Sequence, residues 1–348
     1  MKDNLIFTIS KFFKKVKFIF INDNIIPSMN KPNIMLDSAT KFHDYIYIYG
    51  WFYSENRLNS IKVIGGNNLS YKVLCNIPHN GVLDLGIDLG FSVSILCDKV
   101  IYPDELSLEF SYGKNKVILS VGELISKRLS CYDMSAKIEF DKYLSNNCGL
   151  KILDIGGRDR SKVDRSKFYG SDHEITVLDI ADGENVDVVG DAHLLSNYFS
   201  PNSFDVLVST SVFEHLHSPW KVVIEMNRVL KLGGLALVQT HQTLGMHDMP
   251  WDFWRFSDQA WKAIFNPKTG FEILITNMTH ESYILPFLFR RDKIHAENSA
   301  GFELSTVLVR KIGAAKQKWD VSTNEIISEA YPMTADSFNP ENMEIVFK

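Results

Sequence analysis

The sequence lacks several features that would place it in a class at once. It has only four cysteines, Cys75, Cys97, Cys131 and Cys148, and they form neither a C-x-x-C pair nor a zinc-ligand spacing. We therefore expect reduced thiols in a cytoplasmic protein. No run approaches the ~20 apolar residues that a membrane-spanning helix needs. Positive charge is not in excess either, since the net charge is −5, which argues against nucleic acid as a partner.

The first 30 residues carry a basic amphipathic pattern. At the helical period of about 100° per residue, one face collects apolar side chains and the other collects lysines: Leu5, Ile9, Phe12, Phe13, Val16 and Phe20 against Lys11, Lys14, Lys15 and Lys17. Lysines interrupt the apolar stretch, so the segment is not typical of a signal peptide. Three interpretations stay open: peripheral contact of residues 5–20 with the inner face of an anionic membrane, docking on the protein itself, or a disordered leader.

Residues 31–120 are rich in short β-patterns. Candidate strands, separated by turns rich in Asn, Gly, Pro and Asp, are 45–53, 61–64, 71–74, 91–96, 106–112 and 116–119. This spacing predicts a small antiparallel β-sandwich. We expect Trp51 and the tyrosines near it in the core, with a sugar-binding platform as the alternative. The stretches Tyr49-Gly-Trp-Phe52, Asn76-Ile-Pro-His-Asn80 and Leu89-Gly-Phe91 resemble a β-domain that accompanies glycan-modifying transferases in bacterial polysaccharide systems.

A nucleoside-cofactor site is indicated by two apolar runs. Lys151-Ile-Leu-Asp-Ile-Gly-Gly157 reads as a buried strand entering a glycine turn, and Ile175-Thr-Val-Leu-Asp179 ends in an acid suited to both ribose hydroxyls. The glycines do not fit the dinucleotide fingerprint G-x-G-x-x-G. Asp154 would repel a pyrophosphate, but it would attract a cation such as the amino group of a methionine moiety.

The stretch containing Asp154, Gly156 and Gly157 resembles the first motif of class I S-adenosylmethionine-dependent methyltransferases of type 11. The resemblance continues in order through residues 186–189, 190–194, 203–208, 209–216 and 225–238. It implies S-adenosyl-L-methionine as cofactor and a Rossmann-like doubly wound α/β sheet with a late antiparallel hairpin. The cofactor-binding residues that it implies, together with the two acids above, are Gly156, Gly157, Ile180, Asp191, Ala192 and Ser209, with Asp191 and Ala192 at the adenine.

We divide the chain into four parts on these patterns. Residues 1–30 form the basic segment, 31–120 the β-sandwich, 121–318 the methyltransferase domain, and 319–348 a tail with little periodicity. Helical patterns at 122–129 and 135–144 open the third part and are expected to bridge the domains and cover the cofactor pocket.

Two segments could supply a general base for methyl transfer to a hydroxyl. Glu214 and His215 follow the predicted fourth strand, and a histidine cap for the next helix is the structural alternative. Residues 241–256 follow the fifth strand and are dense in His, Asp, Trp and Arg. We predict His215, His241, His247 and Asp248 as catalytic candidates, and Trp251, Asp252, Trp254 and Arg255 as an acceptor-binding lid. The alternative for this segment is a buried aromatic plug in which Arg255 pairs with Asp252 or Asp248.

These residues predict an O-methyltransferase for a sugar hydroxyl of a cell-surface polysaccharide or its lipid-linked precursor. The acceptor follows from the β-domain resemblance and from aromatic rings that can stack on sugar faces. Neither H-x-E nor H-E-x-x-H spacing is present, so no metal is predicted. A small-molecule methyltransferase and a non-catalytic glycan-binding protein are the alternatives, whereas a nucleotide-sugar oxidoreductase would require the missing third glycine.

Overall fold

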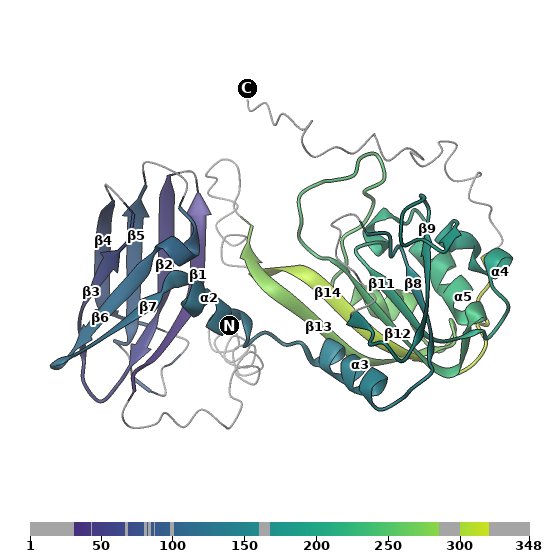
Figure 1. Ribbon diagram of the computed structural model, residues 1–348, viewed down its shortest axis with the longest axis horizontal. Helices are drawn as coiled ribbons and strands as arrows, with labels where there is room; N and C mark the ends of the chain where they lie inside the picture. The colour runs from purple at the N-terminus through teal and green to yellow at the C-terminus, as the bar shows by residue number, and fades with distance from the viewer. Residues whose placement is uncertain are drawn as a thin grey trace, which may run out of the picture. The chain divides into compact units, whose positions relative to one another are not determined.

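A computed structural model gives the arrangement of residues 31–319, apart from 43, 67–68, 80–81, 83–84, 87, 98–100, 160–167 and 285–299 (Figure 1). The chain divides into two compact units, Met1–Tyr132 and Asp133–Lys348. The predicted amphipathic segment 1–30 lies outside the described residues, as does the predicted tail from residue 320 onward. Among the helices that are described, none is both long and apolar enough to cross a membrane.

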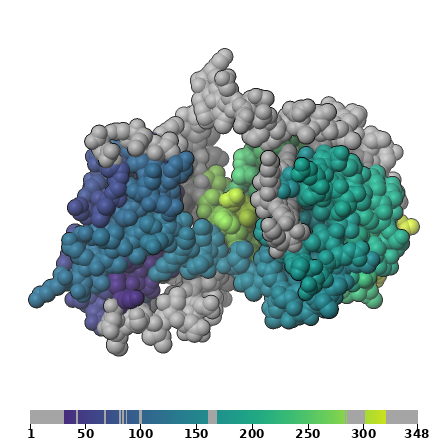
Figure 2. Space-filling view, in the orientation of Figure 1, coloured from purple at the N-terminus to yellow at the C-terminus, as the bar shows by residue number. Residues whose placement is uncertain are grey.

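The first unit is an antiparallel β-sandwich. Its strands are β1 (Asn33–Phe42), β2 (Tyr45–Tyr53), β3 (Leu58–Ile64), β4 (Ser70–Ile77), β5 (Gly90–Leu96), β6 (Ser107–Tyr112) and β7 (Asn115–Ser120). They form one sheet in the order β1-β2-β5-β4 and another in the order β3-β6-β7. Side chains of both sheets share one core, in which the rings of Phe91 and Phe110 meet edge to face at 5.3 Å. The turn between β6 and β7 projects from the surface of this unit (Figure 2).

Strand β2 places its aromatic residues on the face opposite the core. Successive side chains of a strand point to opposite faces, and here Ile46, Ile48 and Phe52 are buried in the core. The residues between them are exposed or half-buried: Tyr45, Tyr47, Tyr49, Trp51 and Tyr53. This differs from our expectation of a core position for Trp51 and its neighbouring tyrosines, because the isoleucines and Phe52 occupy the inward positions. We call these five residues the β2 aromatic stripe.

The two helices before the second sheet belong to different units. Helix α2 (Val121–Leu129) begins with a capping box between Ser120 and Glu123, and its Val121 and Leu124 are buried in the core of the first unit. A short 3₁₀ turn, η2 (Pro103–Glu105), precedes β6. Helix α3 (Ser135–Ser145) instead packs on the second sheet through Ala136, Phe140 and Leu144. The division between the units therefore falls after Tyr132, later than residue 120 where we placed it.

The second unit is built on a seven-stranded sheet of order β10-β9-β8-β11-β12-β14-β13. The strands are β8 (Lys151–Ile155), β9 (Glu174–Asp179), β10 (Val188–Val189), β11 (Phe204–Thr210), β12 (Leu230–His241), β13 (Phe271–Tyr283) and β14 (Ala300–Lys311). The first five are parallel, and β14 lies antiparallel between β12 and β13. This is the predicted Rossmann-like sheet with its late hairpin. Its strand order reverses between β8 and β11, where α/β sheets bind ligands beyond the carboxyl ends of their strands.

Short helices cover this sheet and carry the loops that follow its strands. They are η4 (Ala192–Leu194), α4 (Leu195–Tyr198), η5 (Phe213–His215), α5 (Pro219–Val229) and α6 (Ala260–Ile264). Helix α5 begins at a proline in its first turn and buries Val222, Val223 and Met226 against β8, β11 and β12. The indole of Trp261 in α6 is fully buried and donates to the Ser305 hydroxyl of β14 at 2.7 Å. These contacts fix the strand ends from which the site is built.

Candidate functional site

The turn after β8 can be made only with glycine. Gly156 has φ +75°, and a Cβ there would lie 2.2 Å from Cγ2 of Val212. A Cβ on Gly157 would lie 2.6 Å from the carboxyl carbon of Asp154. The backbone after β8 is therefore pressed between the Asp154 carboxylate and the chain that leaves β11. This close approach brings the predicted cofactor turn beside the segment that carries Glu214 and His215.

Asp154 is a fully buried carboxylate at the end of β8. Its Oδ2 accepts a hydrogen bond of 2.8 Å from the hydroxyl of Tyr169. Burial of a carboxylate is costly unless donors or a cation satisfy it. Its position fits the predicted contact with a cationic group, which stays a prediction. Tyr169 was not predicted from the sequence, because no periodic pattern links it to β8.

Asp179 closes β9 and is held mainly by backbone donors. Its Oδ1 accepts from the Ala181 N–H at 3.0 Å, and its Oδ2 from the Arg158 N–H at 3.3 Å. The Arg158 guanidinium adds an ion pair, with Nε 3.4 Å from Oδ1. Ile180, the next predicted cofactor residue, is half-buried. The carboxylate of Asp179 thus has a fixed orientation beside the glycine turn, as a ribose-binding acid requires. Arg158 is a further residue of this site that the sequence did not indicate.

Asp191 and Ala192 open the short helix η4. The Asp191 carboxylate caps the helix by accepting from the His193 N–H at 2.9 Å, and Nδ1 of His193 lies 2.6 Å from the same oxygen. Burial would raise the pKa of Asp191, but the hydrogen bonds and positive charge of His193 outweigh it and lower that pKa. The ring of His193 stacks on His217 with centroids 4.0 Å apart. Ser209 of β11 is fully buried, and its hydroxyl has no hydrogen-bond partner within the described part of the chain.

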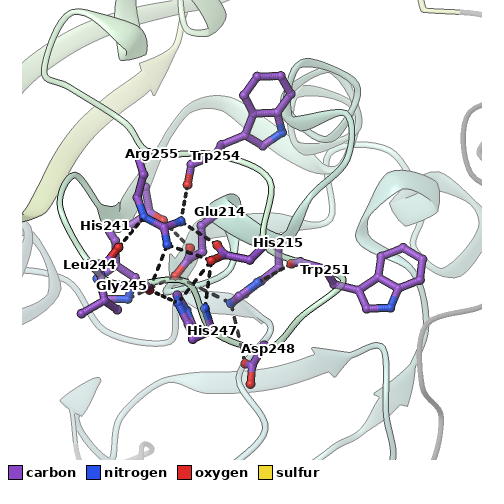
Figure 3. Close-up of polar contacts among 12 residues, drawn as sticks. Glu214, His215, His241, Leu244, Gly245, His247, Asp248, Trp251, Trp254 and Arg255 are labelled. Atoms are coloured by element: carbon purple, nitrogen blue, oxygen red, sulfur yellow. Dashed lines mark hydrogen bonds and ion pairs between the residues drawn. The ribbon is translucent and has the colours of Figure 1, made fainter. Parts of the chain in front are cut away.

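The four predicted catalytic side chains converge with Glu214, as Figure 3 shows. Glu214 and His215 lie in η5 after β11, and His241 is the last residue of β12. We call Glu214, His215, His241, His247 and Asp248 the strand-end cluster. Nε2 of His215 lies 3.8 Å from Oδ2 of Asp248 and 3.9 Å from Oε1 of Glu214, and Nε2 of His241 lies 3.2 Å from the same Glu214 oxygen. The sequence predictions for His215, His241, His247 and Asp248 thus describe one place in the fold.

Backbone carbonyls set the tautomers of two of these histidines. Nδ1 of His215 is 2.6 Å from the Trp251 carbonyl, and Nδ1 of His247 is 3.1 Å from the Gly245 carbonyl. A carbonyl oxygen only accepts, so each Nδ1 carries the proton. Nε2 of the neutral ring is then an acceptor in both residues. His215 and His247 therefore have the tautomer that a proton acceptor or a metal ligand needs.

Glu214 is fully buried at the centre of the cluster. Its Oε2 accepts a hydrogen bond from the Thr240 hydroxyl, whereas its Oε1 accepts none from any residue that the structure describes. Burial lowers the pKa of His241, and the charge of Glu214 opposes this shift. The main-chain carbonyl of Glu214 accepts from the N–H groups of Phe253 and Trp254, which ties the 244–256 loop to η5.

Arg255 is committed to the 244–256 loop. Its guanidinium makes a bidentate pair with Asp252 at 2.6 and 2.8 Å, and it donates to the carbonyls of Leu244, Gly245 and Trp254. This hydrogen bonding lowers the pKa of Asp252 to about 2. The pairing is the one expected for a structural plug. Asp252 and Arg255 thus shape the loop that presents His247 and Asp248, and their role in acceptor binding stays a prediction.

The two tryptophans of the loop do not join the histidines. Figure 3 shows the rings of Trp251 and Trp254 directed away from the strand-end cluster. Trp251 is buried, while Trp254 is 39% exposed and donates from Nε1 to the Leu216 carbonyl at 2.9 Å. The structure thus separates the predicted base candidates from the predicted aromatic contacts. An acceptor that reaches the histidines therefore meets imidazole and carboxylate groups, and the two indoles point away from it.

Comparisons with known proteins identify the second unit. Residues 159–238 match the family model of a methyltransferase domain. A SAM-dependent methyltransferase from Archaeoglobus fulgidus is 15% identical, with 54% of this chain and 98% of that chain covered and a TM-score of 0.37. Another from Aquifex aeolicus is also 15% identical, with 53% and 93% covered and a TM-score of 0.36. A search of the curated proteins found no match to this chain.

The second unit is a methyltransferase domain on a Rossmann-like sheet, in agreement with the family match and the motif order. S-adenosylmethionine as the methyl donor agrees with this match and stays the prediction made from the motif order. The family match spans β9 to β12, the stretch that carries Asp179, Asp191, Ser209 and the η5 residues of the strand-end cluster. The roles of the individual residues stay predictions, which the experiments below address.

Proposed function

We propose that the protein is an O-methyltransferase whose acceptor is a sugar hydroxyl of a polysaccharide or of its lipid-linked precursor. The observation that carries the proposal is the strand-end cluster. Its three imidazoles and two carboxylates stand at the ends of β11 and β12, and the chain between β11 and η5 packs on the glycine turn through Val212. Proton-accepting groups at this position suit a methyl acceptor that is a hydroxyl and must lose its proton. A methyl acceptor that is already nucleophilic would not need them.

The chemistry needs alignment and one proton transfer. The acceptor oxygen attacks the methyl carbon of the sulfonium, the O–CH₃ bond forms, and the bond between methyl and sulfur breaks. The hydroxyl proton passes to the strand-end cluster, and S-adenosylhomocysteine leaves as a neutral thioether. Alignment of oxygen, carbon and sulfur supplies much of the rate. A nearby proton acceptor contributes typically 10²–10⁴-fold more.

The first unit supports a glycan as the acceptor class. The β2 aromatic stripe places five aromatic side chains in a row on one face of a sheet, and the half-buried Ser94 of β5 pairs beside Tyr47. Ser92, which pairs beside Tyr49, is buried. Aromatic rings with hydroxyl groups beside them offer stacking and hydrogen bonds, the two contacts that sugar rings use. The sequence motifs by which we compared this unit with β-domains of glycan-modifying transferases are a further reason for proposing a glycan acceptor.

Label transfer tests the proposal. The protein is incubated with methyl-labelled S-adenosylmethionine and either extracted cell-surface glycan, simple sugars or a panel of small phenols and carboxylates. We expect label in the glycan as a base-stable methyl ether. His215→Gln should lower turnover about 10²–10⁴-fold with cofactor affinity retained, whereas His173→Gln, at a half-buried site before β9, should not. Label that enters only the small molecules would refute the glycan assignment.

A further inference from the structure

We infer that Glu214, His215 and His247 form a binding site for a divalent transition-metal ion such as Zn²⁺. Each of the three residues offers one ligand atom, and these atoms lie within 4.8 Å of one another. The residues come from η5 and from the 244–256 loop, so their spacing in the sequence matches none of the usual zinc motifs. This spacing is why the sequence alone predicted no metal. Only the fold brings them together.

The buried Glu214 carboxylate is the first independent sign of a cation site. Its side chain is fully buried, and Oε1 lacks a hydrogen-bond donor among the described residues while it faces imidazole nitrogens. A buried carboxylate oxygen left in this way is costly unless a cation or a donor satisfies it. The neighbouring carboxylate of Asp248 adds negative charge on the same side. The guanidinium of Arg255 offsets this charge only in part, because it makes its direct ion pair with Asp252.

The histidine tautomers are the second sign. Metal-bound histidines almost always donate their other ring N–H to a carbonyl or carboxylate, which orients the ring. Nδ1 of His215 and Nδ1 of His247 do this toward the carbonyls of Trp251 and Gly245. Two histidines and one carboxylate with open positions are a recurrent ligand set for catalytic zinc and other first-row ions. Tetrahedral geometry at ~2.05 Å bonds sets ligand atoms about 3.3 Å apart, so the side chains must close by roughly 1 Å around the ion.

The role of the ion rests on the proposed function. An acceptor hydroxyl bound at an open position of the metal loses its proton more readily. Because His215 and His247 are then ligands, the hydroxyl proton passes to the Asp248 carboxylate, which lies 3.8 Å from His215 Nε2. The resulting alkoxide attacks the methyl carbon, and the sulfonium becomes a thioether. The metal undergoes no redox change in this step.

Metal binding is measured without any methyl acceptor. The full-length protein is stripped with a chelator and titrated with Zn²⁺ against a chromophoric competitor. We expect one ion per chain, and His215→Gln and His247→Gln should each weaken binding at least about tenfold. The matched control His173→Gln should bind like the wild type. Co²⁺ should give visible bands without thiolate charge transfer, which distinguishes this site from Cys148. Zn²⁺ should also raise the melting temperature of the wild type but not of His247→Gln.

The outcomes separate the site from the proposed function. Equal Zn²⁺ affinity in the wild type and both histidine variants, or no binding at all, overturns the metal site. Bound Zn²⁺ with full methyl transfer after stripping overturns its catalytic role and leaves the O-methyltransferase proposal intact. Bound Zn²⁺ lost in both variants, with no transfer to any glycan, supports the site and refutes the proposed acceptor. If the metal is catalytic, stripping lowers turnover at least about 10²-fold and added Zn²⁺ restores it.

Discussion

Asp179 is oriented almost entirely by the main chain. Two backbone N–H groups hold its oxygens, and the side chain of Arg158 adds a partly buried ion pair. Backbone donors cannot be removed by side-chain substitutions nearby, so the carboxylate keeps its direction in most variants of this region. An acid fixed in this way loses little conformational entropy when it binds a diol.

Replacing Asp179 with alanine should therefore weaken cofactor binding sharply. Two hydrogen bonds from ribose hydroxyls to a charged oxygen contribute roughly 1.5–3 kcal/mol each, and calorimetry with S-adenosylmethionine would measure the loss. Asp182→Ala is the matched control, because Asp182 is exposed and, within the part of the chain that the structure describes, accepts only from the Gly183 N–H. Unchanged affinity in Asp179→Ala would show that the ribose lies elsewhere.

At the scale of elements, the Asp252–Arg255 pair should hold the 244–256 loop over nearly the whole pH range. The folded pKa of Asp252 is about 2, below its ordinary value, because Arg255 hydrogen-bonds to it. A depressed acid pKa stabilises the fold above the unfolded pKa, and this contribution is lost as pH falls through about 2. Asp252→Asn should cost about 2 kcal/mol at pH 7, with faster hydrogen exchange in the loop.

The half-buried Asp258 provides a control for this substitution. Among the described residues its carboxylate accepts only from the Gln259 side chain, so Asp258→Asn should leave both exchange and stability unchanged. Full exchange protection of the loop in Asp252→Asn would mean that the bonds from Phe253 and Trp254 to the Glu214 carbonyl suffice to hold it.

The stacked imidazoles before α5 predict a different pH response. Burial, reinforced by the positive charge of His193, lowers the pKa of His217 to about 4. The unfolded chain binds this proton near pH 6.5 and the folded chain only near 4, so stability should fall as pH drops across that window. The loss reaches on the order of 2–3 kcal/mol. Thermal melts of the wild type and His217→Gln between pH 7 and 4 would measure it, and equal slopes would contradict the assignment.

Elements whose side chains follow a regular periodic pattern could be predicted from the sequence. Elements in which that pattern is interrupted could not. Strand β2 alternates strictly, and its predicted bounds match the structure. Strand β1 was missed because Asp37, Ser38 and Lys41 interrupt its apolar pattern, and a bulge between Leu36 and Ser38 shifts its register. Only its ladder with β2 makes it a strand, and such tertiary pairing leaves little trace in a local sequence.

The site shows the same limit. The order of motifs predicted which strand ends carry the histidines, because parallel strands place their carboxyl ends at one edge of the sheet. The direction of each ring depends on the carbonyls of Trp251 and Gly245, and a backbone carbonyl has no residue-specific signal. The choice of Asp252 as the partner of Arg255 was likewise one of two alternatives until the loop geometry selected it.

For the whole molecule, the separate cores of the two units predict two unfolding transitions. Phe91 is fully buried in the sandwich core and Phe213 in the core under α5. Phe91→Ala should lower the free energy of unfolding of the first unit only, and Phe213→Ala that of the second unit only. Each substitution should cost about 3–5 kcal/mol. S-adenosylmethionine should raise only the second transition, since a ligand stabilises the unit that binds it. Calorimetry that shows a single transition shifted by both variants would contradict this division.

The antiparallel insertion of β14 has a consequence for synthesis. Residues 235–241 of β12 pair with residues 304–310, while the opposite edge of β12 pairs with β11, which is made earlier. As the chain leaves the ribosome, β12 therefore stays an open sheet edge that carries apolar side chains until β14 has been translated. An unpaired edge of this kind invites pairing with other chains. We expect the nascent protein to depend on chaperones during this interval. The completed protein should no longer need them, because β14 then covers the edge of β12.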